Sequence, residues 1–152
     1  MDYLIDFITN RIFVSTAASW FIAQFTKILI EWIKGGFRPE RIAGGGGFPS
    51  AHSATVTGLA CSTGIVCGTG GFEFVMALIF AIVVMYDAMG VRYETGQQAK
   101  VLNRMREKEL SEGREPEQDK PMEEKIGHTF PEIAAGVILG IFVAAIVCYL
   151  MR

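Results

Sequence analysis

Four apolar blocks, each close to the length of a bilayer-spanning helix, place the strongest limit on the fold of this chain. The blocks, which are nearly free of charge, cover residues 12–33, 53–69, 72–91 and 130–151. A helix needs about 20 consecutive apolar residues to cross a bilayer. We therefore predict an all-α, polytopic membrane bundle of four transmembrane helices. The alternative is a soluble helical bundle whose helices are buried.

Length and composition agree with one membrane-embedded domain. The chain has 152 residues, of which 51% are apolar, and we expect a single domain over residues 1–152. A charged loop at residues 92–128 interrupts it, with a cytoplasmic amphipathic helix near residues 94–110 and a linker at 111–121. Asp2 and Asp6 stand where a signal peptide would be basic, so none is expected. The three cysteines lie within the predicted helices and are interpreted as small apolar residues: Cys61, Cys67 and Cys148.

The distribution of charge predicts how the helices are oriented. Four spans put the loops 34–52 and 92–128 on one side, and that side carries most of the lysines and arginines. The other side carries only Arg11 and Arg152. The positive-inside rule then places both long loops in the cytoplasm, as expected for an integral protein of a bacterial inner membrane. Acidic residues balance the bases in the charged loop, so no nucleic-acid partner is expected.

The two histidines of the chain each stand at the start of a predicted helix. His52 follows the glycine run 44–47, and His128 follows Gly127. Helix N-termini present unpaired N–H groups and a positive dipole end, which together favour an anion. Two such termini with an imidazole each suggest acid–base or nucleophilic chemistry on a phosphoryl group. Ser50 is expected to cap its helix, but capping does not explain an imidazole in the first turn.

Three charged residues near the predicted helix ends have both a structural and a functional interpretation. A lysine within a span is costly, so Lys27 is a candidate anion ligand, unless it pairs with Glu31 or reaches the interface. Asp87 is a functional candidate, or it pairs with Arg92. Glu132 completes a capping box with Thr129, or it orients His128, and the two roles can coexist.

Small residues predict which helices pack closely. The second predicted helix is rich in Ser, Ala, Thr and Gly, and the fourth contains Ala135, Gly136 and Gly140. Small residues let helix backbones approach closely within lipid. We therefore expect the second helix to be central to the bundle and the fourth to make a close contact.

Several motifs resemble those of one superfamily. They are Pro49-Ser50-Ala51-His52, His128 with Glu132 four residues on, Ala23-Gln24 followed by Lys27, and Asp87 through Arg92 continuing to Gln98 and Asn103. With these the chain resembles the type 2 phosphatidic acid phosphatase and vanadium haloperoxidase superfamily. The similarity is to its divergent branch of small bacterial and plastid membrane proteins.

The resemblance implies a role for each of these residues. His128 would be the nucleophile that forms a phosphohistidine, Glu132 its orienting carboxylate, and His52 the general acid; no metal or other cofactor is implied. The phosphoryl oxygens would be held by Lys27, Arg38, Ser50 and the helix amides at Ala51. The superfamily also has a Ser-Arg pair, for which this chain has Pro121 and Met122. Arg92 or Lys125 would supply the missing charge, and Gln98 and Asn103 are further candidates.

These observations predict a membrane lipid phosphatase whose site lies at the cytoplasmic face. Its substrate would be a phospholipid or isoprenoid phosphate or diphosphate, and we expect the two imidazoles to lie within reach of one phosphate. One alternative is a non-catalytic protein that binds or transports a lipid phosphate. Another is a metal site built from His52, His128, Asp87 and Glu132. The superfamily core has six helices, so a homodimer would complete the bundle.

Overall fold

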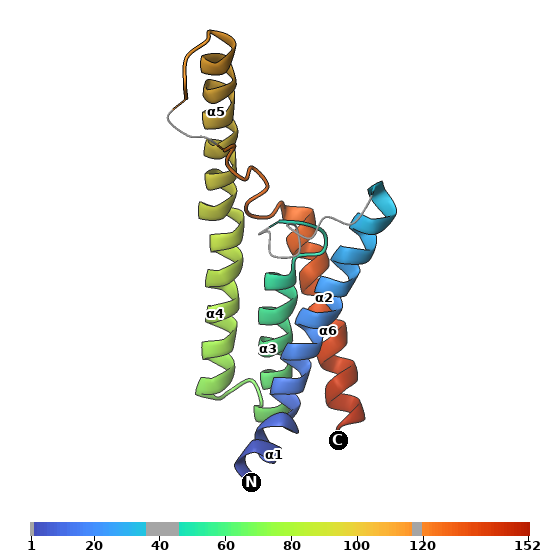
Figure 1. The fold of residues 1–152 in the computed structure, drawn as a ribbon. Helices are drawn as coiled ribbons and strands as arrows, with labels where there is room; N and C mark the ends of the chain where they lie inside the picture. Colours follow the sequence, from blue (N-terminus) through green and yellow to red (C-terminus); the bar gives the residue numbers. More distant parts are fainter. Residues whose placement is uncertain (1, 36–45, 117–119) are drawn as a thin grey trace.

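The computed structural model describes residues 2–35, 46–116 and 120–152, and the regular secondary structure in these ranges is helical (Figure 1). The helices are α1 (Asp2–Ile8), α2 (Arg11–Gly35), α3 (Ala51–Cys67), α4 (Phe72–Met89), α5 (Val91–Ser111) and α6 (Phe130–Leu150). The predicted all-α class is confirmed. The short helix α1 had no counterpart among the predicted helices.

Helix α3 is the centre of the bundle. It packs against α2 and α6 on one side and against α4 on the other (Figure 1). The contact with α6 is backbone to backbone: a β-carbon at Gly140 would lie 2.6 Å from the carbonyl oxygen of Ala54, and one at Gly136 would touch that of Ser50. The close contact predicted from the small residues of these two helices is therefore confirmed.

Within the part of the chain that the structure describes, three helices are long and apolar enough to cross a membrane. The spans are Arg11–Ile33, Phe72–Ser111 and Phe130–Leu150, the second of which contains both α4 and α5. Helix α3 has 17 residues, which corresponds to about 25 Å of helix, somewhat less than the roughly 30 Å of a hydrocarbon core. The count of four membrane helices is therefore not confirmed, and a membrane-spanning α3 stays a prediction.

Helix α5 continues the line of α4 beyond the rest of the bundle, after a joint at Gly90 (Figure 1). The chain then returns along α5 toward the start of α6. We call residues 120–128 the return segment. It covers the face of α5 on which Gly96, Ala99 and Asn103 are buried. The face with Gln98, Leu102 and Met105 is exposed.

The ends of the helices are sorted as the four apolar blocks of the sequence predicted. The two termini and the α3–α4 turn lie at one end of the bundle, whereas α3 and α6 begin at the other (Figure 1). Both histidine motifs therefore lie at the same end. That this end faces the cytoplasm stays a prediction.

Candidate active site at the N-termini of two helices

The two histidines meet where α3 and α6 begin. His52 lies in the first turn of α3, and His128 stands two residues before α6. Their ring centroids are 5.8 Å apart, with the ring planes at 64°. His128 is 4% exposed, whereas His52 is exposed. The structure thus joins one buried and one accessible imidazole from segments that are far apart in the sequence.

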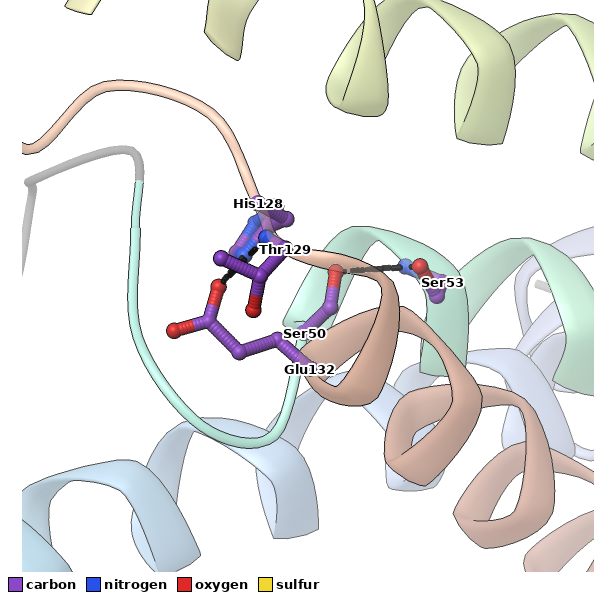
Figure 2. A network of polar contacts seen from close by, with 5 residues as sticks. All are labelled: Ser50, Ser53, His128, Thr129 and Glu132. Carbon is purple, nitrogen blue, oxygen red and sulfur yellow. Dashed lines mark hydrogen bonds and ion pairs between the residues drawn. The ribbon is translucent and has the colours of Figure 1, made fainter.

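One carboxylate oxygen of Glu132 contacts both Thr129 and His128. Its Oε2 accepts the backbone N–H of Thr129 at 2.9 Å, as a capping box requires, and lies 3.4 Å from Nδ1 of His128 (Figure 2). The second distance is long for a hydrogen bond, and the contact is an ion pair only when the imidazole of His128 is protonated. Neither ring nitrogen of His128 has a hydrogen-bond partner within the described part of the chain. The capping role expected of Glu132 is confirmed, and its role in orienting His128 stays a prediction.

Backbone hydrogen bonds fix the segments that carry the histidines. The N–H of His128 donates to the carbonyl of Ala88, 3.0 Å away, and the N–H of Ser50 donates to the carbonyl of Glu132, 2.9 Å away. Gly127 has φ of +80°, and a β-carbon there would collide with the backbone nitrogen of Tyr93. A glycine is therefore required immediately before His128.

Burial sets the charge state of His128. The cost of desolvating a charged imidazole lowers its pKa below the ordinary value. The carboxylate of Glu132 opposes this and raises the pKa, whereas His52 and Lys27 lower it. Burial is the largest of these influences, so His128 is neutral at neutral pH. The neutral ring is the form that can attack an electrophile.

Lys27 of α2 lies near the two histidines and packs against the loop that precedes α3. Lys27 is 5% exposed, and its charge acts on both histidines. Gly47 has φ of +122°, and a β-carbon there would lie 2.6 Å from Cε of Lys27. Part of the glycine run therefore serves to let the loop pack on the Lys27 stem.

Ser50 is the N-cap of α3, as predicted. Its Oγ accepts the backbone N–H of Ser53 at 3.3 Å and the hydroxyl of Ser53 at 3.0 Å (Figure 2). Ala51 follows it, 9% exposed, at the start of the helix. Ser53 was not among the predicted site residues, although its position three residues after Ser50 places it within reach of the cap.

Of the other charged residues predicted for the site, Asp87 and Arg92 form an ion pair with each other, and Lys125 lies near Lys27. Nε of Arg92 lies 2.6 Å from Oδ2 of Asp87, so these two make the ion pair that was one of the two expectations for Asp87. Both act electrostatically on His52. Lys125 is exposed, lies against Gly46 and acts electrostatically on Lys27. Arg38 falls outside the described residues.

The remaining candidates lie on α5, away from the two rings. Gln98 is on the exposed face of α5, and Asn103 bonds to the return segment. Within residues 2–35, 46–116 and 120–152, no group of three or more His, Cys, Asp or Glu side chains is arranged to hold a metal ion. The four residues of the alternative metal site therefore do not form such a group in this structure.

Comparisons with known proteins agree with the resemblance to the divergent branch of the superfamily. Residues 8–143 match the model of the Divergent PAP2 family. The chain is also 30% identical over 154 residues to the "Uncharacterized membrane protein YuiD" of Bacillus subtilis (strain 168), an alignment covering 95% of this chain and 98% of the relative. No solved structure matches the chain. The protein described here is thus an integral membrane protein that belongs to the Divergent PAP2 family.

Proposed function

We propose that this protein is a membrane lipid phosphatase that works through a phosphohistidine on His128. The observation that carries the proposal is the pair of imidazoles with centroids 5.8 Å apart. An attacking nitrogen must approach phosphorus to about 3–3.5 Å, and a proton donor must lie about 2.6–3.2 Å from the leaving oxygen. Rings with centroids 5.8 Å apart are close enough for both to contact one phosphoryl group.

In the first step, the neutral Nε2 of His128 attacks phosphorus and the bond from phosphorus to the lipid oxygen breaks. Protonated His52 gives its proton to that oxygen. The position of Glu132 beside Nδ1 supports this assignment, because a carboxylate there keeps the proton on Nδ1 and stabilises the charge that develops on the ring. In the second step, water attacks phosphorus, neutral His52 takes its proton, the P–N bond breaks and inorganic phosphate leaves.

Cationic groups and backbone amides surround the place where the phosphoryl oxygens would lie. Lys27 is buried beside the histidines, and α3 offers its N-terminal amides at Ala51 and beyond. The hydroxyl of Ser50, the exposed Lys125 and the paired Arg92 are further donors in this proposal, with Arg38 added from the sequence motif. Fixed donors of this kind stabilise the charge spread over a transferring phosphoryl group.

The position of the site in the bundle favours a lipid substrate. His128 stands just before α6, which is apolar along its length, and His52 lies beside it at the start of α3. A phosphate head group anchored in the membrane would arrive at this depth, with its chains alongside the helices. We therefore propose a phospholipid or isoprenoid phosphate or diphosphate as substrate, and the cytoplasmic membrane face as its place of reaction.

The test is phosphate release by purified protein in detergent micelles. The probes are dioleoyl phosphatidic acid and farnesyl diphosphate. We expect release from at least one of them, no release by His128→Ala, and a decrease of about 10²- to 10⁴-fold in His52→Ala. Leu102→Ala, on the exposed face of α5, is the matched control and should keep full activity. Full activity of His128→Ala would remove the proposed nucleophile.

A second candidate is a protein that binds or transports a lipid phosphate without turnover. It is favoured by Pro121 and Met122 at the positions of the superfamily Ser-Arg pair, and by the engagement of Arg92 with Asp87. The same assay separates the two candidates. Binding of phosphatidic acid without phosphate release, unchanged in His52→Ala and His128→Ala, would favour this candidate over the phosphatase.

A further inference from the structure

The geometry points to Asn103 as a positioning residue for His128: its side chain clamps the return segment onto α5 and so sets the ring of His128 beside His52. This inference rests on the proposed function, because the position of the ring matters for catalysis only if His128 reacts. Asn103 itself touches neither histidine, and it acts through the backbone of the return segment.

We call the three hydrogen bonds from Asn103 to Met122 and Glu124 the clamp, and they use both the oxygen and the nitrogen of the side-chain amide. Asn103 is 8% exposed, and its Nδ2 donates to the carbonyl of Met122 at 2.9 Å and to Oε1 of Glu124 at 2.8 Å. Its Oδ1 accepts the N–H of Met122 at 2.8 Å. A single side chain thus satisfies both backbone groups of Met122. Asparagine is a poor residue for a helix interior, so the stability of α5 alone gives no reason for it.

The buried face of α5 extends this clamp toward the site. Gly96 lies seven residues before Asn103, on the same face of the helix. A β-carbon at Gly96 would lie 2.7 Å from the carbonyl oxygen of Glu124 and 2.8 Å from that of Ile126. The return segment therefore runs in direct contact with the backbone of α5 between Met122 and Gly127, where glycine again permits the approach to Tyr93.

The ring of His128 depends on this backbone path. Its N–H is held by Ala88, and among the described residues no hydrogen bond reaches either ring nitrogen. The Glu132 contact at 3.4 Å is too long to fix the ring by itself. The backbone path of the return segment therefore determines where His128 lies. Asn103 holds that path against α5 by its hydrogen bonds to Met122 and Glu124.

The kinetic test compares variants of the clamp in the full-length protein with phosphatidic acid as probe. Asn103→Ala removes all three hydrogen bonds, and we expect kcat to fall by about 10- to 100-fold, as for a reacting group displaced by about 1 Å. The fall in kcat should exceed any rise in KM, because Lys27 and the α3 terminus are not altered and only Lys125, on the return segment itself, is displaced among the proposed phosphate ligands. Glu124→Ala removes one of the three bonds and should give a smaller loss of kcat. Leu102→Ala is the control on the exposed face.

A second readout does not depend on activity. The chain has only two histidines, so protein labelled with ¹⁵N-histidine and purified with a histidine-free tag gives two imidazole signal sets, which His52→Ala assigns. In Asn103→Ala we expect the titration of His128 to move up toward the ordinary value near 6.5, because a displaced ring gains water. The charged groups that face the ring are Glu132 on α6, His52 on α3 and Lys27 on α2. They are unchanged in this variant.

The outcomes separate the two proposals. If the wild type releases no phosphate but Asn103→Ala moves the His128 titration, the phosphatase proposal fails and the clamp stands. If the wild type is active and Asn103→Ala changes neither kcat nor the titration, the clamp is overturned. A raised KM at unchanged kcat would also overturn it. If Asn103→Ala loses its helical circular dichroism, Glu124→Ala decides by the same criteria.

Discussion

At the scale of single residues, the two imidazoles differ in exposure, and this difference matches different tasks. His128 is buried, so it is held neutral and away from water, as a nucleophile should be. His52 is exposed and can exchange protons with solvent between steps. The sequence motif suggested these roles before the structure, but the distance between the rings depends on three packed helices and could not be read from it.

Substitutions at Glu132 should separate its two roles. In Glu132→Gln the amide oxygen can still accept the N–H of Thr129, so we expect the free energy of unfolding to change by less than the roughly 1 kcal/mol that a helix cap contributes. Activity should fall, because the negative charge beside Nδ1 is lost. Glu132→Ala should lose activity and about 0.5–2 kcal/mol of stability together. Equal activity of Glu132→Gln and the wild type would show that the carboxylate only caps the helix.

The decrease of kcat/KM at acid pH should report the protonation of His128. Burial lowers the pKa of this imidazole, so the neutral, nucleophilic form persists below the ordinary pKa of about 6.5. As pH falls through the lowered pKa, the ring becomes protonated and kcat/KM should decrease. Because Glu132 raises this pKa, the limb should lie at still lower pH in Glu132→Gln. If kcat/KM of the wild type already fell at a pH above about 6.5, or if the fall moved to higher pH in Glu132→Gln, His128 would not be the nucleophile.

At the scale of helices, local signals predicted where α3 and α6 begin. Ser50 caps α3, and Thr129 with Glu132 opens α6. Asn10, which accepts the N–H groups of Ile12 and Phe13 at the start of α2, was not among the predicted caps. These signals lie within a few residues of the helices that they start. The return segment is different, because its partners on α5 are about 20 residues away, as in the pair of Asn103 and Met122. No local pattern could have paired them.

The glycine contact between α3 and α6 should be intolerant of side chains. In Gly140→Leu the new β-carbon would lie 2.6 Å from the carbonyl oxygen of Ala54 and 3.0 Å from the nitrogen of Gly58. We expect a loss of roughly 1–3 kcal/mol, typical of an overpacked core, in unfolding by a graded increase of SDS in mixed micelles. Gly70→Leu is the matched control, since nothing lies within 4 Å of a β-carbon there. Equal stability of the two variants would contradict the packing described here.

At the scale of the whole molecule, apolarity and charge predicted most of the architecture. Apolarity located the three candidate spans found among the described residues, and the order of the apolar blocks placed the starts of α3 and α6 at one end of the bundle. Apolarity and charge did not settle whether α3 spans the membrane. Its 17 residues pack against three other helices. A helix shielded by its neighbours can be short and rich in small polar residues, such as the buried Ser53 and Ser62, because it meets protein rather than lipid.

The orientation in the membrane can be tested with two engineered cysteines. The native Cys61, Cys67 and Cys148 are first replaced by serine. Gly70→Cys lies in the α3–α4 turn and Glu115→Cys follows α5, and Figure 1 shows that turn and the end of α5 at opposite ends of the molecule. The basic loops favour the cytoplasm. We therefore expect a membrane-impermeant maleimide to label Gly70→Cys in intact bacteria, and Glu115→Cys only after permeabilisation. The reverse pattern would place the histidines on the outer side.

The most direct test of the phosphatase mechanism is to trap the intermediate. Protein mixed with a lipid phosphate that carries ³²P in its phosphoryl group is quenched with alkali within a single turnover and digested. We expect covalent label on His128 that resists alkali and is lost in acid, in the wild type and in Leu102→Ala but not in His128→Ala. Release of phosphate with no label on His128, or with label on another residue, would contradict the mechanism.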